Sequence, residues 1–203
     1  MRIHERLLVL LILTAVSNLM CAQGTKEETQ DIIKSPSPDG HFALRISSTI
    51  ENGTESRNAE LIEKASSKVL IDMGAPGHLD ETILVWSADS KRVAYATRFE
   101  KEGETHVYFL NGSAFEEVDL PDDLPGPEIK VPKNAGDVKN YGGADKPLRW
   151  SKSGDLEMSS DLMLLSRDNG KTYTGVVHYT IAFDAQHHAS VKNVGKTITR
   201  VED

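Results

Sequence analysis

The sequence predicts an all-β domain, an antiparallel meander of about three similar units. Three short segments of similar sequence recur at a spacing of roughly 50 residues, a period typical of propeller-like β architectures. Turn signals recur at short intervals between alternating apolar segments, and few stretches show helical periodicity. Closed propellers need about 4–8 blades. The sequence therefore predicts an open arc, a two-sheet sandwich, or half of a ring that a second copy completes, and not a closed single-chain propeller.

The three similar segments share one turn pattern. Each has a Ser that leads into a turn of Asp, Ser or Gly, followed by an apolar strand, and the copies are Ser37-Pro38-Asp39-Gly40, Trp86-Ser87-Ala88-Asp89-Ser90 and Trp150-Ser151-Lys152-Ser153-Gly154. The Asp can bond its own backbone, the Gly accepts a positive φ, and the Trp supplies a large apolar surface between sheets. We expect buried aromatic and aliphatic side chains around these turns, at Trp86, Tyr95, Val107, Phe109, Trp150, Tyr179, Ile181 and Phe183.

These residues resemble the repeat of TolB-like β-propellers, in which Trp-Ser-Pro-Asp-Gly-Lys leads into an inner strand. The resemblance covers about a dozen residues in each of three places, and residue 88 is Ala where the repeat has Pro. The third copy has Lys152-Ser153-Gly154 without the Asp. The resemblance implies a repeat architecture of propeller-blade-like units, and it transfers no functional residue.

The first 22 residues are typical of a secretory signal peptide. Arg2 and Arg6 precede an apolar stretch from Leu7 to Val16, which is shorter than the roughly 20 residues that span a bilayer. Cleavage after Ala22 predicts a periplasmic or secreted protein. Lipoprotein anchoring through Cys21, the single cysteine, is the alternative. A flexible lead-in at 23–32 and one domain at 33–203 would follow.

The composition argues against several classes of partner and site. The net charge is −8, and it would become −9 after loss of residues 1–22. Acidic chains without a basic cluster are poor ligands for nucleic acid, which requires cations to replace its counterions. The body of the chain has no thiol, so it offers no disulfide and no cysteine metal site. We expect no cofactor, no nucleic acid and no transmembrane segment.

The first unit is expected from about Ile33 to Met73. It would contain strands at 41–46, 59–63 and 68–72 and a turn at Glu51-Asn52-Gly53. A short helix over 56–65 is the competing prediction. The second unit, from about 81 to 120, has Val93, Tyr95 and Phe99 on one face of its first long strand. We expect Val107 and Phe109 to continue that face, with hairpin connections at 100–104 and at Asn111-Gly112.

The third unit is expected from about Pro147 to Asn193. Its longest strand has two faces. One carries Tyr173, Val177, Tyr179, Ile181 and Phe183, and the other carries Thr174, His178 and Thr180. Within this unit, Ser166-Arg167-Asp168-Asn169-Gly170-Lys171-Thr172-Tyr173 is similar to the Asp-box of sialidases, with Tyr173 in place of Trp. In that family the box is a hairpin turn away from the catalytic centre, and its Ser and Asp bond the backbone of the turn. The resemblance therefore implies a structural role.

A long loop at 121–146 interrupts the meander, with four prolines and four glycines. Loops of this length are often functional. Its lone aromatic, Tyr141, has polar neighbours, and this composition is typical of a contact surface. The candidate binding residues are Lys139, Asn140, Tyr141 and Asp145. The alternatives are a loop that wraps the edge of the sheet and a buried Tyr141 that pins the loop in place.

Other motifs have simpler interpretations. Asn52-Gly53-Thr54 and Asn111-Gly112-Ser113 fit the glycosylation pattern, but Asn-Gly is also a strong hairpin signal. His187-His188, near His178 and Asp184, would point to opposite faces if extended, which disfavours a metal site. Asp119, Asp122 and Asp123 lack the regular spacing of a calcium loop.

No catalytic pattern is present, and no Gly-x-Ser-x-Gly motif occurs. The sequence therefore favours a secreted or periplasmic, non-catalytic interaction module that binds a protein or a glycan. The alternative is a small extracytoplasmic hydrolase whose acidic residues come from separate turns. Two or more convergent carboxylates or histidines in a cleft would favour the hydrolase.

Overall fold

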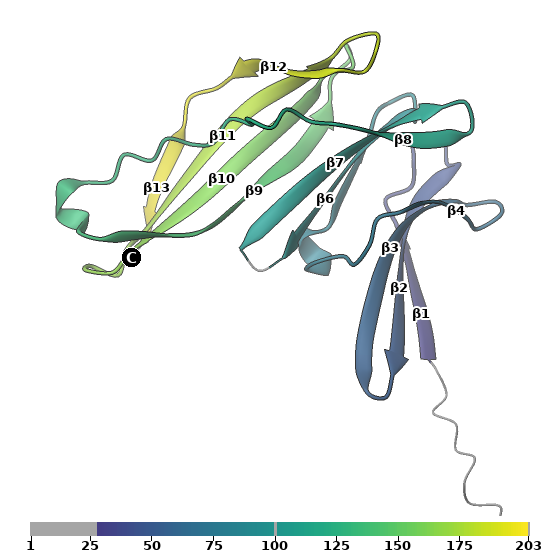
Figure 1. Cartoon of the computed structure of the whole chain (residues 1–203), viewed down its shortest axis with the longest axis horizontal. Helices are drawn as coiled ribbons and strands as arrows, with labels where there is room; N and C mark the ends of the chain where they lie inside the picture. Colours follow the sequence, from purple (N-terminus) through teal and green to yellow (C-terminus); the bar gives the residue numbers. More distant parts are fainter. Residues whose placement is uncertain (1–27, 100, 203) are drawn as a thin grey trace, which may run out of the picture.

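A computed structural model describes residues 28–99 and 101–202, which form thirteen β-strands and two short 3-10 turns. The strands lie in two sheets, one of four strands and one of nine, and neither sheet closes on itself. The prediction of an open, all-β domain is confirmed. Figure 1 shows three groups of strands following one another along the long axis of the molecule. The predicted signal peptide, Cys21 and residues 23–27 lie outside the described residues.

The first unit is the four-stranded sheet, in the order β1-β2-β3-β4. Its strands are β1 (Glu28–Lys34), β2 (Phe42–Glu51), β3 (Thr54–Glu63) and β4 (Lys68–Asp72). The predicted pairing of 59–63 with 68–72 is confirmed, and the segment 56–65 forms a strand and turn rather than a helix. The lead-in predicted at 23–32 is ordered as strand from Glu28 onward, because β1 pairs along its whole length with β2.

The second and third units share the nine-stranded sheet. The second contains β5 (Ile83–Trp86), β6 (Arg92–Phe99), β7 (Glu102–Asn111) and β8 (Ala114–Val118). The third contains β9 (Val138–Trp150), β10 (Leu156–Ser166), β11 (Thr172–Phe183), β12 (Ala189–Val194) and β13 (Ile198–Glu202). The two units join at one short parallel pairing, in which Glu102 and Gly103 of β7 lie opposite Gly143 and Ala144 of β9.

The repeated turn has the same hydrogen bonds in the first two units. The Ser hydroxyl donates to the Asp carboxylate at 2.6 Å in both, from Ser37 to Asp39 and from Ser87 to Asp89. The same hydroxyl accepts from the backbone N–H five residues on, at 2.9 Å. The fourth residue of each turn has a positive φ, at Gly40, Ser90 and Gly154. In the third unit the turn is one residue shorter, because Ser151 N donates to Asp155 O.

The two tryptophans connect successive units. The indole Nε1 of Trp86 donates to Ser35 O in the first unit at 2.9 Å, and that of Trp150 donates to Val85 O in the second unit at 3.1 Å. Ser35 and Val85 hold the same place, two residues before the Ser that opens the turn. The contact between one unit and the next is therefore repeated along with the turn.

Apolar side chains pack on both faces of the second unit. One cluster, with the first unit, comprises Leu44, Ile46, Ala59, Leu61, Val93, Tyr95, Tyr108 and Phe115. The other, with the third unit, comprises Ala94, Val107, Phe109, Val118, Leu156, Met158, Tyr179 and Ile181. The second unit therefore lies between its neighbours, as a blade does in a propeller-like stack.

Two details of the predicted core are wrong. The register of β6 and β7 places Val107 opposite Ala94 and Tyr108 opposite Val93. Val107 and Phe109 therefore lie on the other face from Val93 and Tyr95, and both faces are buried. Phe99, the last residue of β6, is 47% exposed. The side chains predicted to be buried differ in their exposure. Five are buried: Tyr95, Val107, Phe109, Tyr179 and Ile181. Three are only partly buried: Trp86, Trp150 and Phe183.

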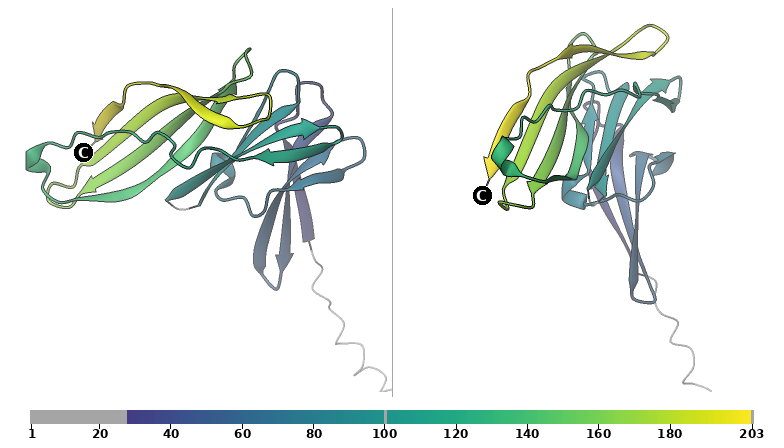
Figure 2. Two further views of the ribbon diagram at one scale, coloured as in Figure 1. Left: turned by 45° about the horizontal axis from the view of Figure 1, so that its top comes forward. Right: turned by 60° about the vertical axis from the view of Figure 1, so that its left-hand side comes forward.

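The predicted faces of the third unit are confirmed. On β11, Tyr173, Val177, Tyr179 and Ile181 are buried, and Thr174, His178 and Thr180 alternate with them on the more exposed face. The second unit covers only one end of this long sheet. The other end is covered by the connection between β8 and β9, which crosses the sheet in Figure 2.

That connection is shorter than predicted. The expected loop at 121–146 ends at Asp137, because β9 begins at Val138 and pairs with β10 in spite of its glycines. The remaining segment is an extended strap with a 3-10 turn at Lys133–Ala135. Pro127 and Ala135 are buried on the sheet, and Gly175 of β11 leaves room for Ile129 and Pro127. Residues 121–137 therefore wrap the third unit.

Candidate functional site

The four candidate binding residues lie on β9, and the structure separates them into two environments. Asn140 and Tyr141 lie beside the tip of the β6–β7 hairpin, whereas Asp145 is turned toward the interior. Lys139 is exposed on β9 opposite Leu165. Asn140 and Tyr141 are both exposed.

Tyr141 is the extra residue of a β-bulge. Asn140 lies opposite Leu164 and Gly142 opposite Met163, so Tyr141 has no partner in the ladder of β9 with β10. The bulge depends on Gly142, whose φ is +132°, a value that L side chains rarely adopt. The Asn140 carboxamide oxygen accepts a 2.8 Å hydrogen bond from Gly142 N and holds the bend. The ring of Tyr141 is thereby directed outward and is 48% exposed.

The tip of the β6–β7 hairpin docks against this bulge. Gly143 N donates to Lys101 O at 2.9 Å, and the Lys101 ammonium lies 5.0 Å from the centre of the Tyr141 ring. A cation over a Tyr face at this distance is attracted by the electrons of the ring. The approach needs small residues, since a Cβ on Gly103 would lie 2.7 Å from the Cβ of Ala144. The run Gly142-Gly143-Ala144 is therefore a docking surface for the hairpin.

A shallow cavity of about 470 Å³ lies at the same hairpin, lined by Phe99, Lys101, Glu102 and Glu104. Phe99 and Tyr141 are both about half exposed, and Lys101 borders both. We call Phe99, Lys101, Glu104 and Tyr141 the hairpin-tip surface. The sequence gives no hint of Phe99 and Lys101, because the alternation of β6 suggests that Phe99 is in the core.

Asp145 has a structural role that the sequence does not reveal. Its carboxylate accepts a 2.8 Å hydrogen bond from the Tyr179 hydroxyl, and its backbone oxygen accepts one of 2.6 Å from the Thr105 hydroxyl. Burial, reinforced by the Asp145 charge, raises the pKa of Tyr179. Tyr179 therefore stays protonated and donates. Asp145 links β9 to β7 and β11 rather than facing a partner.

The histidine pair does not form a chelating group. His187 has a positive φ and packs its ring 4.6 Å from that of Phe109, whereas His188 contacts the Asp184 carboxylate at 3.0 Å. His178 lies on the exposed face of β11. Among residues 28–99 and 101–202, no group of three or more His, Cys, Asp or Glu side chains is placed to hold a metal ion. No helix in this part of the chain is long and apolar enough to cross a membrane.

A second cavity, of about 410 Å³, lies between β8 and the β11–β12 turn, and acidic and histidine side chains line it. Glu116 and Glu117 are consecutive on β8. The carboxylate of Glu117 contacts His106 Nδ1 at 2.7 Å, and that of Glu116 accepts hydrogen bonds from the Asn111 amide at 3.1 Å. Each carboxylate is thus bonded to a different side chain of β7, within the same β7–β8 hairpin, and the two carboxylates do not converge.

The turn that is similar to an Asp-box anchors the strap. Ser166 donates a buried 2.6 Å hydrogen bond to Ala135 O, and the Asp168 carboxylate accepts from Asp137 N at 3.3 Å. Ser166 also bonds the turn itself, since it accepts from Asn169 N. The expectation that Asp168 bonds the backbone of its own turn is wrong, because Asn169 does so by accepting from Lys171 N. The structural role that the resemblance implies therefore includes holding residues 135–137.

No family model matches the chain, and no curated protein matches it. Three solved structures are weakly similar in fold. Prolyl oligopeptidase B from Galerina marginata is 14% identical with a TM-score of 0.35, over 86% of this chain and 24% of that one. TolB from Acinetobacter baumannii is 12% identical with a TM-score of 0.33, over 79% of this chain and 43% of that one. The C-terminal domain of YpeB from Bacillus megaterium is 9% identical with a TM-score of 0.18, over 91% of this chain and 97% of that one.

The chain thus spans a quarter to less than half of the first two structures. TolB is a β-propeller protein, so the likeness is a weak propeller-like resemblance. At these TM-scores it extends to no activity, substrate or partner.

Proposed function

We propose that the protein is a secreted or periplasmic, non-catalytic interaction module that binds a protein or glycan partner through the hairpin-tip surface. The observation that carries the proposal is that Lys101 lies over the ring of Tyr141 and lines a cavity with Phe99, and that both aromatic side chains are about half exposed. Aromatic side chains are enriched among the residues that dominate binding energy at interfaces. A surface that exposes two of them around one cation is suited to recognition.

The backbone beneath this surface is preorganised. The bulge at Tyr141 is fixed by the Asn140–Gly142 bond, and the hairpin is fixed to β9 by the bond from Gly143 to Lys101. A partner would therefore lose little affinity to ordering of the site. A hydrolase would instead require convergent carboxylates, and the acidic cavity at β8 holds Glu116 and Glu117 in separate contacts. No observation favours the hydrolase over the binding module.

The test compares two exposed bulge residues of the same strand. Tyr141→Ser removes the aromatic from the hairpin-tip surface. Leu148→Ser is the matched control, because Leu148 is also skipped by the ladder of β9 with β10 and is 46% exposed. Partners are captured from the native extracytoplasmic fraction and quantified, and a glycan array is probed in parallel.

We expect Tyr141→Ser to lose partner or glycan signal and Leu148→Ser to keep it, with both variants folded by circular dichroism. Equal recovery by the wild-type protein and Tyr141→Ser contradicts the proposal. Replacement of residues 134–145 by a Gly-Ser linker is a poorer test, because it removes the first part of β9.

A further inference from the structure

The chain contains three Asn-Gly pairs, at Asn52-Gly53, Asn111-Gly112 and Asn169-Gly170. An asparagine followed by glycine is chemically labile, because the unhindered glycine nitrogen can attack the asparagine side-chain carbonyl. All three pairs are exposed at turns of the described structure, with Asn111 as the last residue of β7. Exposure therefore does not distinguish them, but their hydrogen bonds do.

Two of the asparagines have their side chains held in place. The Asn111 amide nitrogen donates to both carboxylate oxygens of Glu116 at 3.1 Å. The Asn169 oxygen accepts from Lys171 N at 2.9 Å, and its amide nitrogen donates to the Tyr173 hydroxyl at 3.4 Å. The attacking nitrogen of this third pair is also engaged, since Gly170 N donates to Ser166 O at 3.2 Å.

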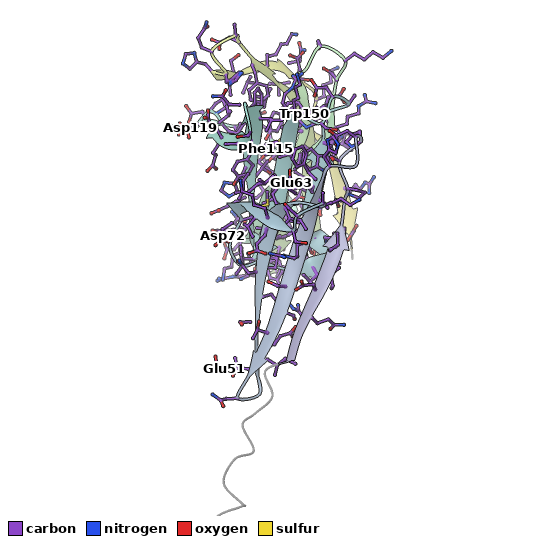
Figure 3. The ribbon with its side chains drawn as sticks, turned by 90° about the vertical axis from the view of Figure 1, so that its right-hand side faces the viewer. Glu51, Glu63, Asp72, Phe115, Asp119 and Trp150 are labelled. Atoms are coloured by element: carbon purple, nitrogen blue, oxygen red, sulfur yellow. The ribbon has the colours of Figure 1, made fainter. Side chains whose placement is uncertain are left out.

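Asn52 differs from both. It lies at the tip of the β2–β3 hairpin, where Glu51 pairs with Thr54 and both turn residues have a positive φ. Across residues 28–99 and 101–202, neither the Asn52 side chain nor Gly53 N makes a hydrogen bond. Figure 3 shows Glu51, its neighbour, at the far end of the projecting hairpin, well away from Trp150 and Phe115. The Asn52 carboxamide can therefore rotate toward Gly53 N without breaking a contact.

We propose that Asn52 is a site of spontaneous deamidation in the folded protein, and that the contacts of Asn111 and Asn169 protect those two residues. Gly53 N loses its proton and forms a bond to Asn52 Cγ. The bond from Cγ to the side-chain nitrogen breaks, and that nitrogen takes up a proton and leaves as ammonia. Water then opens the resulting succinimide at either carbonyl and yields aspartate or isoaspartate, with no redox change.

The product has a defined local consequence. A new carboxylate joins Glu51 and Glu55 at the tip, and isoaspartate adds a methylene to a turn of only two residues. Type I′ turns of this length depend on their backbone geometry. We expect the outer ladder of β2 and β3 to loosen, whereas the core, which begins at Ile46 and Ala59, stays intact.

The test uses the three sites of one sample as mutual controls. The full mature chain is incubated at mildly alkaline pH, in buffer and in concentrated urea, then digested and mapped by mass spectrometry. In urea the three pairs should convert at similar rates. In buffer Asn52 should convert about tenfold faster than Asn111 and Asn169, the factor expected when one net hydrogen bond must first be broken. Equal rates in buffer, or a faster Asn111 or Asn169, overturn the proposal.

A variant tests the cause of protection. Glu116→Ala removes the acceptor of the Asn111 amide at an exposed position, so Asn111 should then deamidate in buffer at a rate close to that of Asn52. An unchanged Asn111 rate in this variant contradicts the role assigned to the hydrogen bond. Asn52→Gln identifies the product, because the acidic species resolved by ion exchange should disappear.

Discussion

The indole nitrogen of Trp150 hydrogen-bonds the backbone oxygen of Val85, the residue just before Trp86. Trp86 makes the corresponding bond to Ser35 in the unit before it. Each tryptophan ring also lies against aromatic neighbours, Trp86 against Phe42 and Phe115, and Trp150 against Phe109. The residue that marks the repeat in sequence is thus the residue that holds consecutive units together.

Replacement of Trp86 by Ala should lower the free energy of unfolding by about 3–5 kcal/mol, because it removes a large apolar side chain from the contact between the first two units. Trp86→Phe keeps an aromatic ring but loses the bond to Ser35, so it should lower the free energy of unfolding by about 0.5–1.5 kcal/mol for that bond, with a further loss from the reduced packing. Urea denaturation measures both. An unchanged midpoint in Trp86→Ala would show that the repeat does not stabilise the fold.

Substitution of Gly143 should weaken the pairing of β9 with β10 in the third unit. A Cβ at this position would collide with the backbone oxygen of Asp161, which cannot move without distorting β10. We expect Gly143→Ala to destabilise by about 1–3 kcal/mol, the range typical of overpacking. Gly126→Ala is the control, since nothing lies within 4 Å of its Cβ position, and it should change stability by less than about 0.5 kcal/mol.

Asp155 should make stability depend on pH in the acid range. The hydrogen bond from Lys192, at 2.9 Å, is the largest cause that lowers the pKa of Asp155, and Ser153 contributes a further hydrogen bond. A lowered pKa in the folded state means that the unfolded state binds a proton first as the pH falls. The contribution of Asp155 to the free energy of unfolding is therefore complete above the ordinary pKa of 3.8. It disappears as the pH falls through the lower pKa of the folded state.

Unfolding of the wild-type protein and of Asp155→Asn, measured from neutral to strongly acidic pH, tests this sign. The difference in stability between the two should be constant near neutral pH and should shrink in acid. Lys192→Met should remove most of the pH-dependent difference, because Lys192 is the main partner. A difference that grows as the pH falls contradicts the assignment.

The N-terminus of the exported protein should lie near Gln23. This expectation rests on the short apolar stretch between Leu7 and Val16 and on the small residue Ala22. Intact mass spectrometry of the protein from the extracytoplasmic fraction gives the result directly. A lipid-modified Cys21 at the mature N-terminus would show instead that the chain is a lipoprotein.

Local signals predicted the fold well wherever turn chemistry and alternation agree. The Ser-x-Asp turns at Ser37 and Ser87 have the hydrogen bonds that their sequence implies, and the alternation of β11 gives the correct faces. The error at Val107 has a physical reason. A strand buried on both faces shows no useful alternation, so only the register with β6 reveals which side each residue occupies.

The candidate site was harder to predict, because it depends on contacts between segments far apart in the chain. The glycines at 142 and 143 give this segment the composition of a loop, but each has a contact that requires a small residue. A Cβ on Gly142 would meet the backbone oxygen of Lys101 in the β6–β7 hairpin, and one on Gly143 would meet the backbone oxygen of Asp161 on β10. Tyr141 stood out by composition, whereas Lys101 carries no sequence signal and becomes significant only through its position over the Tyr141 ring. Asp145 lies in a segment with the composition of a loop, and its hydrogen bond from the Tyr179 hydroxyl is apparent only in three dimensions.

Pro36 occupies the place that Trp86 and Trp150 hold in the later units, so the first unit has no indole with which to reach backward. Arg149, at the other end, holds the place of the carbonyl acceptors Ser35 and Val85. The contact between units is therefore directional, because each tryptophan donates to the unit before its own. A further copy of the repeat, inserted by duplication or by design after the third unit, would have the backbone oxygen of Arg149 as the acceptor for its tryptophan. A copy placed before the first unit would receive no such bond, because the first unit has Pro36 in the tryptophan position.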